Sequence, residues 1–529
     1  MNVADRLVKW AAAQPDAVAI IEAAKQGERV VTFGELDRRA AALSARLNNK
    51  GLKRGDRVLV MIGVSIDLYV ALSALLRGGY VTEFLDPSAG RAHVRRCCEV
   101  APPAALLGPW KAQLLRLWFG GLRRVRSVMY PPVFGRGVAE GGGDVVSCEA
   151  ETPALLTFTS GSTASPKAAV RTHGLLSAQQ SALEKAIDLR PSQVDLATLP
   201  VFVLANLAAG VTTVLADADL RRPGQVEPGP VLDQIKRHGV TRSAGSPAFY
   251  ARLADHCEQT GQTLEPLEQV YTGGAPVFPD LLARLDRLMP GGRPVVVYGS
   301  TEAEPIAHYG FDEMDADDLA EMQAGRGLLV GAPVPEVELA VVDTDRLAGP
   351  SVSEAALASA RCGVGEPGEV LVTGEHVLKG YVDPADDAET KVRVGDRVWH
   401  KTGDMATRDS EGRLWLLGRA SAVMRDGRGT VYPFAIECGA RQVEGVKLAA
   451  VAALNGRRLL TVELTGDAGE ASVERELGER FAGVIDRVVV LAELPVDGRH
   501  NAKVRMPELL RRLEALGLAG DTTETTHAD

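Results

Sequence analysis

The chain has 529 residues, a length that predicts more than one domain. An apolar content of 46% and a charged content of 24% are typical of a globular protein with a large core. The net charge of −10 argues against wholesale electrostatic binding of nucleic acid, although local donors can still bind a small polyanion.

The sequence also limits where the protein works. No run of about 18 apolar residues occurs, so no transmembrane segment is expected. The first fifteen residues lack the long apolar run of a signal peptide. The six cysteines show no C-x-x-C spacing, which favours reduced thiols and a cytoplasmic protein.

Helical and strand patterns alternate in the first 150 residues. Residues 36–50 have helical spacing, 57–62 form a short apolar run, and 66–77 are helical again. This alternation predicts a parallel α/β sheet with crossover helices. Residues 114–126 (LLRLWFGGLRRVR) allow a membrane-surface or partner helix, or a helix packed on the sheet; Gly120 and Gly121 favour the second.

Three polar or glycine-rich stretches predict flexible surface insertions, at residues 135–143, 312–326 and 348–368. The last ten residues are polar, and a disordered tail is expected from about residue 520. Near residue 418 a glycine-rich, charged stretch precedes a compact run of strands and helices, which indicates a hinge and a small α+β domain.

A loop rich in hydroxyls and glycine lies between two predicted strands. Its sequence is TSGSTASPK, residues 159–167. Glycine lets the backbone approach a ligand, hydroxyl and N–H groups can surround phosphate oxygens, and Lys167 adds a positive charge. It is not a Walker A loop, because Pro166 precedes the lysine and Ala168 follows it. Alone, the loop could equally be a solvated turn.

Three later segments carry similar chemistry. YGSTE at 298–302 follows a predicted strand and offers an aromatic face, a hydroxyl and a carboxylate. WHKTGD at 399–404 and GRLWLLGR at 412–419 are consistent with a β-hairpin of ordinary turns, but Asp404 could bridge ribose hydroxyls and Arg419 could meet an anion. Lys503 ends the segment LPVDGRHNAK, and in isolation such a lysine is more often a surface residue.

Taken together and in this order, these motifs resemble the adenylate-forming superfamily of acyl-CoA ligases, peptide-synthetase adenylation domains and luciferases. The resemblance covers nearly the whole chain. It implies an α/β fold, with a large N-terminal adenylation domain (residues 1–418) made of α/β subdomains and a small mobile α+β C-terminal domain (419–529). It also implies an AMP-forming ligase that uses ATP and Mg²⁺ to convert a carboxylic acid into an acyl-AMP.

The resemblance assigns roles to individual residues. Lys503 would bridge the carboxylate and the α-phosphate, Thr301 would bind the α-phosphate, and Glu302 would ligate Mg²⁺. Lys167 is the fourth expected catalytic residue, and with its loop it would hold the β- and γ-phosphates. The expected nucleotide-binding set is Thr159, Ser160, Gly161, Ser162, Thr163, Lys167, Gly274, Ala275, Pro276, Tyr298, Gly299, Thr301, Asp404 and Arg419. Within it, Gly274 to Pro276 would run along the adenine and Tyr298 would stack on it.

Several departures from the common pattern weaken a CoA-ligase interpretation. Ala164-Ser165 stand where the family shows a glycine, and Val203 stands where many CoA ligases have a histidine. Ser421 replaces the charged hinge residue. Arg428 lies near the place of a glycine that often lines a pantetheine tunnel.

Other segments are similar to the OleC-type β-lactone synthetases of bacterial olefin biosynthesis: GSP at 245–247, DLRRP at 219–223, YGSTEA at 298–303, WH at 399–400 and PVDGRHNAK at 495–503. This branch adenylates a long-chain β-hydroxy acid, whose hydroxyl then attacks the activated carboxyl and expels AMP. The apolar residues Val203, Leu204, Leu207 and Phe249 are candidates for an acyl pocket or for plain core. Transfer to CoA or an acyl-carrier protein, and ATP binding without catalysis, remain the alternatives.

Overall fold

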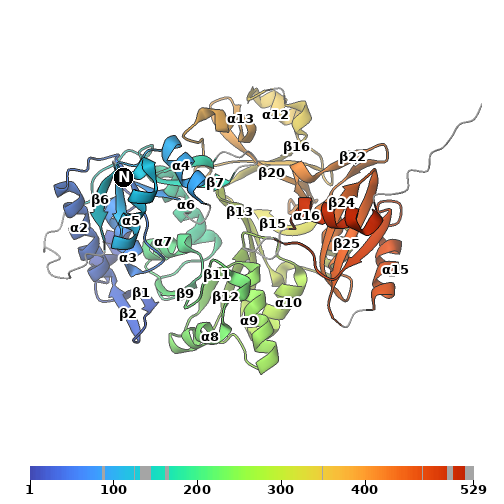
Figure 1. Cartoon of the computed structure of the whole chain (residues 1–529), viewed down its shortest axis with the longest axis horizontal. Coiled ribbons are helices and arrows are strands. Elements are labelled where there is room, and N and C mark those ends of the chain that lie inside the picture. Colours follow the sequence, from blue (N-terminus) through green and yellow to red (C-terminus); the bar gives the residue numbers. More distant parts are fainter. Residues whose placement is uncertain are drawn as a thin grey trace, which may run out of the picture.

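The computed structural model describes residues 1–85, 90–123, 125–130, 144–160, 166–347, 349–466, 469–496 and 504–518. Helices α2 and α3 lie toward one end of the molecule, and strands β24 and β25 lie toward the other (Figure 1). The chain up to about Arg419 forms a large α/β part, and the chain after it forms a small part with its own sheet. This architecture confirms the predicted fold class; the boundary at residues 418 and 419 stays a prediction.

A six-stranded sheet holds the first part of the chain, in the order β6–β5–β3–β4–β7–β8. Neighbouring strands are parallel except for β7 and β8, which form an antiparallel hairpin. The predicted helix at residues 66–77 is α3, which is buried throughout because it is apolar on nearly all sides. The elements are β3 (Arg57–Val60), β4 (Val81–Phe84), β5 (Ala105–Gly108), β6 (Arg126–Met129), β7 (Pro153–Ser160), β8 (Pro166–Thr172), α2 (Phe33–Asn49), α3 (Ile66–Arg77), α4 (Arg91–Val100) and α5 (Trp110–Trp118).

A second, larger sheet begins as a parallel α/β layer. From β13 outward the order is β13–β12–β11–β9–β10–β1, all parallel, with β2 antiparallel at the edge. The strands are β1 (Val18–Ala23), β2 (Glu28–Thr32), β9 (Val194–Ala197), β10 (Thr212–Leu215), β11 (Arg242–Gly245), β12 (Gln269–Gly273) and β13 (Arg293–Ser300). The helices are α1 (Asp5–Ala13), α6 (His173–Ala186), α7 (Pro200–Ala209), α8 (Pro228–Arg237), α9 (Pro247–Thr260) and α10 (Pro279–Leu288).

Beyond β13 the same sheet continues almost entirely antiparallel. The order runs β13–β14–β15–β21–β20–β18–β16, and β19 pairs with β20 and β17. This end carries YGSTE at the end of β13 and in the turn that follows, and KTGD within β20. The elements are β14 (Ala303–Gly310), β15 (Leu328–Pro333), β16 (Glu338–Val342), β17 (Ser351–Val352), β18 (Gly368–Thr373), β19 (Lys391–Val394), β20 (Arg397–Arg408), β21 (Leu414–Arg419), α11 (Ala316–Gln323), α12 (Glu354–Ala360) and α13 (Asp387–Thr390).

The small part follows Arg419. A hairpin of β22 and β23 precedes a three-stranded sheet in the order β24–β25–β26, which packs with α14 and α15 around a separate apolar core. The elements are β22 (Met424–Asp426), β23 (Gly429–Val431), β24 (Val446–Leu454), β25 (Arg457–Leu464), β26 (Arg487–Leu491), α14 (Pro433–Ala440), α15 (Glu470–Arg480) and α16 (Met506–Leu513). Across the described ranges, the helices are too short or too polar to cross a membrane.

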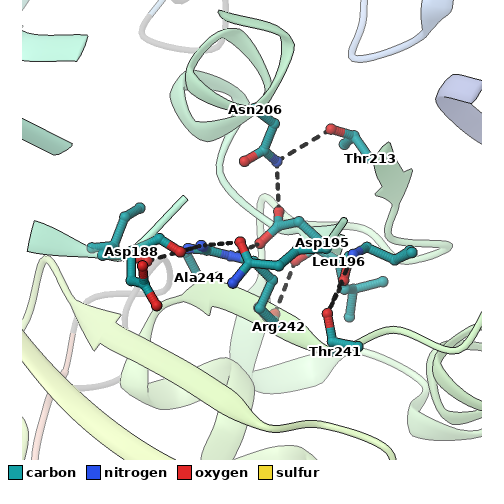
Figure 2. Close-up of polar contacts among 12 residues, drawn as sticks. Asp188, Asp195, Leu196, Asn206, Thr213, Thr241, Arg242 and Ala244 are labelled. Carbon is teal, nitrogen blue, oxygen red and sulfur yellow. Dashed lines mark hydrogen bonds and ion pairs between the residues drawn. The ribbon is translucent and has the colours of Figure 1, made fainter. Parts of the chain in front are cut away.

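A buried polar network fixes α7 on the parallel sheet (Figure 2). Arg242 on β11 and Asp195 on β9 are each 1% exposed, and Nε lies 3.2 Å from Oδ1. Asn206 on α7 donates to Asp195 Oδ2 at 2.8 Å and to Thr213 Oγ1 at 3.2 Å. A buried carboxylate is costly unless it is paired and hydrogen-bonded. The network therefore ties α7 to three neighbouring strands at one defined position.

Three sequence expectations need correction. Residues 312–326 contain the regular helix α11 rather than a wholly flexible insertion, because Asp315 caps its first turn and Arg413 pairs with the buried Asp318. Residues 354–360, within the second expected insertion, form α12. The segment at 114–126 is helical only to Trp118, and Arg126 begins β6. Residues 135–143 and 520–529 lie outside the described residues.

Candidate active site

The YGSTE and KTGD segments meet at one group of hydrogen bonds. Tyr298, near the end of β13, donates from its hydroxyl to Asp404 Oδ2 at 2.8 Å. Arg419 donates to Asp404 Oδ1 at 2.8 Å and to the Thr402 carbonyl at 3.1 Å. Burial, followed by the Asp404 charge, raises the Tyr298 pKa well above its ordinary value, so the phenol stays a donor. Tyr298 lies 106 positions from Asp404 in the chain and Arg419 lies 15 positions from it, and each donates to one of its two carboxylate oxygens.

The hairpin pairing explains this arrangement. Asp404 on β20 lies directly opposite Arg419 on β21, so their side chains can leave the same face of the sheet. Gly403 has a φ of +73° just before the aspartate, and an added Cβ there would lie 2.8 Å from the Arg419 guanidinium. A glycine is therefore required where the chain turns Asp404 toward Tyr298.

The carboxylate of Glu302 lies at the turn between β13 and β14. The Tyr381 hydroxyl donates to Glu302 Oε1 at 2.9 Å. Burial and the adjacent Glu302 charge raise the pKa of Tyr381, which keeps this hydroxyl protonated. The Tyr381 ring also lies 6.0 Å from Lys167 Nζ and 5.5 Å from Lys391 Nζ. Tyr381 thus links the expected metal ligand to two lysines.

Lys167 is buried and paired. Its Nζ lies 2.9 Å from Glu389 Oε2, and the lysine is 4% exposed at the start of β8. Thr159 at the end of β7 is the register partner of Lys167, and Ser160 is the partner of Pro166. Gly161, Ser162 and Thr163 of the expected phosphate loop lie outside the described residues, and so does Lys503.

The expected adenine segment lies beside the YGSTE strand. Gly274, Ala275 and Pro276 follow β12, which pairs in parallel with β13. Gly274 has a φ of +74°, a conformation that favours glycine. Gly274 and Pro276 are exposed, and Ala275 is partly exposed, so the segment is open to a ligand at the carboxyl ends of two parallel strands.

A cavity of about 1130 Å³ opens at this site. Its polar end is lined by Thr301, Glu302, Thr402, Arg419 and Ser421, among others. Its other end is apolar and is formed by side chains from α1, α3, α6, α7 and nearby strands. These residues are Val3, Leu7, Leu68, Leu72, Leu76, Leu155, Leu176, Leu183, Leu204 and Leu207.

Two of the four residues expected at an acyl pocket line this cavity. Leu204 and Leu207 lie on α7 and face it. Val203 is 1% exposed and packs in a hydrophobic core with side chains of α2 and α3, and it is not among the cavity-lining residues. Phe249 is fully buried in a separate core around α9, edge-on to Tyr250. Val203 and Phe249 are therefore core residues and do not line the cavity.

The site suits a magnesium ion that is shared with phosphates. No cluster of three or more His, Cys, Asp or Glu side chains that could hold a metal ion is present among the described residues. Mg²⁺ is usually held by one or two carboxylates together with substrate phosphates, so Glu302 would fit as its protein ligand. Its hydrogen bond from Tyr381 would orient the carboxylate for this role.

Sequence reasoning missed several polar residues of the cavity wall, among them Tyr381, Glu389, His400 and Arg171. Tyr381 and Glu389 gave no local signal, because their contacts are with distant segments, whereas His400 was noted only within the WH segment and its contact is with the nearby Lys391. Burial and Lys391 lower the pKa of His400 to about 3, so its imidazole is neutral. Arg171 did give a signal, since it follows three apolar residues in the strand Pro166–Thr172.

Comparison with known proteins identifies the family. Residues 7–382 match the family model described as AMP-binding enzyme. The chain is 31% identical to an olefin beta-lactone synthetase of Stenotrophomonas maltophilia, over 96% of this chain and 97% of the relative. It is 32% identical to an olefin beta-lactone synthetase of Xanthomonas campestris, with 96% of each chain covered. A feruloyl-CoA synthase of an Amycolatopsis species is 30% identical over 90% of this chain and 89% of the relative.

Solved structures show the same fold. ATP-bound MatB from Rhodopseudomonas palustris has a TM-score of 0.78 and 23% identity, with 98% of this chain and 100% of that chain covered. The amide bond synthetase McbA from Marinactinospora thermotolerans also has a TM-score of 0.78, at 22% identity, covering 97% of this chain and 99% of that one. The chain therefore belongs to the AMP-binding enzyme family, and it is an AMP-forming ligase of the adenylate-forming superfamily that is similar along its length to olefin β-lactone synthetases.

Proposed function

We propose that this ligase adenylates a β-hydroxy carboxylic acid with a long apolar chain, and that the β-hydroxyl then displaces AMP to give a β-lactone. The single observation that carries the proposal is the cavity, which runs from Thr301 and Glu302 into an apolar arm lined by leucines. The similarity to olefin β-lactone synthetases over 96% of the chain supports the same reaction. A long apolar arm suits an acyl chain, since burying each CH₂ contributes about 0.8 kcal/mol.

In the first step, a carboxylate oxygen of the acid forms a bond to the α-phosphorus of ATP, and pyrophosphate leaves. Lys167 holds the β- and γ-phosphates, Thr301 holds the α-phosphate, and Lys503 offsets the charge between the carboxylate and the α-phosphate. Asp404 accepts from the ribose hydroxyls, and Tyr298 fixes that carboxylate. Mg²⁺ held by Glu302 and the phosphates would supply further neutralisation of charge.

In the second step, the β-hydroxyl oxygen forms a bond to the acyl carbon while the bond from that carbon to the phosphate oxygen breaks. AMP leaves with the electron pair, and the hydroxyl proton is released. The four-membered ring is strained, so the mixed anhydride must supply the leaving group and the cavity must hold the oxygen near the carbon. No external thiol is required.

The alternative is transfer of the acyl group to CoA or to a carrier protein. The feruloyl-CoA synthase relative favours it. Two features of the small part weigh against it: Arg428 lies in the turn of the β22–β23 hairpin, and its guanidinium makes an ion pair with Asp486. A glycine here would have no side chain, whereas the arginine places a charged group beside this turn.

The two functions are separated by product analysis. The enzyme is incubated with ATP, Mg²⁺ and a long-chain β-hydroxy acid, with and without CoA, and pyrophosphate release and product masses are measured. We expect pyrophosphate, AMP and a product lighter than the acid by one water, without CoA. The matched acid that lacks the hydroxyl should give no such product. Acyl-CoA formed only when CoA is added, with no lactone, would exclude the proposal in favour of the ligase alternative.

A further inference from the structure

A buried arginine lies in the wall of the cavity. Arg171 on β8 is 8% exposed and is one of the cavity-lining residues. Its Nη1 donates to Thr157 Oγ1 and its Nη2 to the Thr301 carbonyl, both at 2.7 Å. An arginine has five N–H donors, so these two bonds leave others for a ligand. Neither partner is charged.

The charge of Arg171 is not neutralised by direct contact. Within the described chain, Arg171 has no ion pair with a carboxylate. Burial lowers its pKa, and the charges of Glu302 and Glu304 act against that change. Arginine stays protonated in proteins, so a full positive charge lies in the wall. Burying such a charge is costly, and neither strand pairing nor the apolar core requires it here.

The position of Arg171 along the cavity indicates what it could bind. On one side, its hydrogen bond to Thr301 places the guanidinium beside the residue assigned to the α-phosphate. On the other side, its register partner Leu155 belongs to the apolar arm. A substrate that reaches from Thr301 into this arm would therefore have Arg171 beside the part of its chain that follows the carboxyl group.

We propose that Arg171 is a specificity-determining residue that binds the β-oxygen of the acid substrate. This inference rests on the proposed function, which supplies a β-hydroxyl on the substrate. The guanidinium would hold that oxygen on the side of the chain where it can reach the activated carboxyl carbon. A site built to hydrogen-bond a hydroxyl discriminates strongly against a substrate that lacks it, because the buried donor is then left unpaired.

The test compares two acids of equal length, one with and one without the β-hydroxyl. For each acid, kcat/KM for pyrophosphate release is measured with wild-type enzyme, Arg171→Met and Arg171→Lys. We expect the preference for the hydroxy acid to fall by about tenfold or more in Arg171→Met. Arg171→Lys, which keeps the charge, should restore part of it. The ratio of kcat/KM for the two acids cancels any general loss of activity caused by the missing hydrogen bond to Thr301.

Thr157→Val is the matched control, because it removes the Nη1 partner while the guanidinium stays in the wall. The preference of this variant for the hydroxy acid should stay within about twofold of the wild-type preference. Losing a hydrogen bond to a charged group would change it by much more than twofold. If wild-type enzyme forms lactone but Arg171→Met keeps the full preference, or loses activity equally on both acids, the assignment of Arg171 is wrong and the proposed function stands. If wild-type enzyme forms no lactone, the proposed function fails and the inference fails with it.

Discussion

Lys167 and Glu389 form an ion pair of 2.9 Å although 222 residues separate them in the chain. The lysine side chain is 5% exposed and the glutamate side chain is 57% exposed. The lysine assigned to the ATP phosphates is therefore already engaged, and a nucleotide has to compete with a carboxylate for it.

This competition predicts that Glu389→Gln strengthens ATP binding. The substitution frees Lys167 and removes a negative charge from the phosphate side of the site. We expect the KM for ATP to fall by about two- to fivefold, with the larger change at low ionic strength. Glu336→Gln is the control, since it breaks the pair with Lys185, which does not line the cavity. A KM that rises in Glu389→Gln would show that the glutamate supports the lysine instead.

Tyr298→Phe tests the contact between the YGSTE and KTGD segments. The variant keeps the ring but loses the hydrogen bond to Asp404. A bond to a charged acceptor contributes about 1.5–3 kcal/mol, so the KM for ATP should rise about tenfold, while kcat changes little. Tyr309→Phe provides a matched control, because the buried Tyr309 hydroxyl has no partner among the described residues. If the two variants changed the KM for ATP equally, the Tyr298 hydroxyl would have no specific role in nucleotide binding.

Leu204→Trp tests the apolar arm. Leu204 is only partly buried and lines the cavity, so a larger side chain at this position of α7 would narrow the cavity. We expect kcat/KM for a long-chain acid to fall at least about tenfold and that for a short acid to change little. The assay is pyrophosphate release over a series of chain lengths. A uniform loss at every length would indicate damage to the fold rather than a narrower arm.

Lys503→Ala tests the assignment made from sequence alone. Adenylation should fall by about 10²–10³-fold, because the lysine acts on charge that develops in the transition state. ATP affinity, measured by calorimetry, should stay close to wild type. Lys447→Ala removes an exposed lysine of the same small part, paired with Glu463, and should leave both quantities unchanged. Normal pyrophosphate release in Lys503→Ala would refute the assigned role.

Glu437 predicts a pH dependence of stability in the small part. Burial raises the pKa of this carboxyl from 4.5 to about 7, although the Val451 amide donates to it. The Glu437 carboxyl ionises near pH 4.5 in the unfolded chain and only near pH 7 in the folded chain. Stability from this group is therefore fully present below pH 4.5 and is lost as the pH rises to about 7.

Thermal unfolding of wild type and Glu437→Gln at pH 5 and pH 8 measures this effect. The glutamine keeps an acceptor for Val451 and cannot ionise. We expect the variant to be more stable than wild type at pH 8 by a few degrees, with little difference at pH 5. The same difference in Tm at both pH values would contradict the assigned cause.

The order of motifs along the chain was sufficient to predict the fold class and the family, because each motif has a distinctive local sequence. Tyr298, Asp404 and Arg419 were singled out separately, and the structure brings them into one hydrogen-bonded group. Lys503 and most of the phosphate loop lie outside the described residues, so their roles stay predictions.

The wall of the cavity could not be predicted to the same degree. In α7 almost every residue is apolar, so the pattern does not distinguish Leu204, which faces the cavity, from Val203, which faces the core. The position of α7 depends on Asn206 and its bond to Asp195, a contact between two strands and a helix that no local pattern specifies. Contacts such as that of Tyr381 with Glu302 span 79 residues and arise only when the sheet is assembled.

The ion pair between Asp404 and Arg419 has a consequence for motion. Asp404 belongs to the large part, and Arg419 is the last residue of β21, where the chain leaves for the small part. If the ribose hydroxyls of a nucleotide bind Asp404, they use the same carboxylate that is paired with Arg419. By thermodynamic reciprocity, if nucleotide binding changes the freedom of the predicted hinge, the orientation of the small part changes nucleotide affinity by the same factor. The release of AMP and the predicted rotation of the small part would then be thermodynamically coupled.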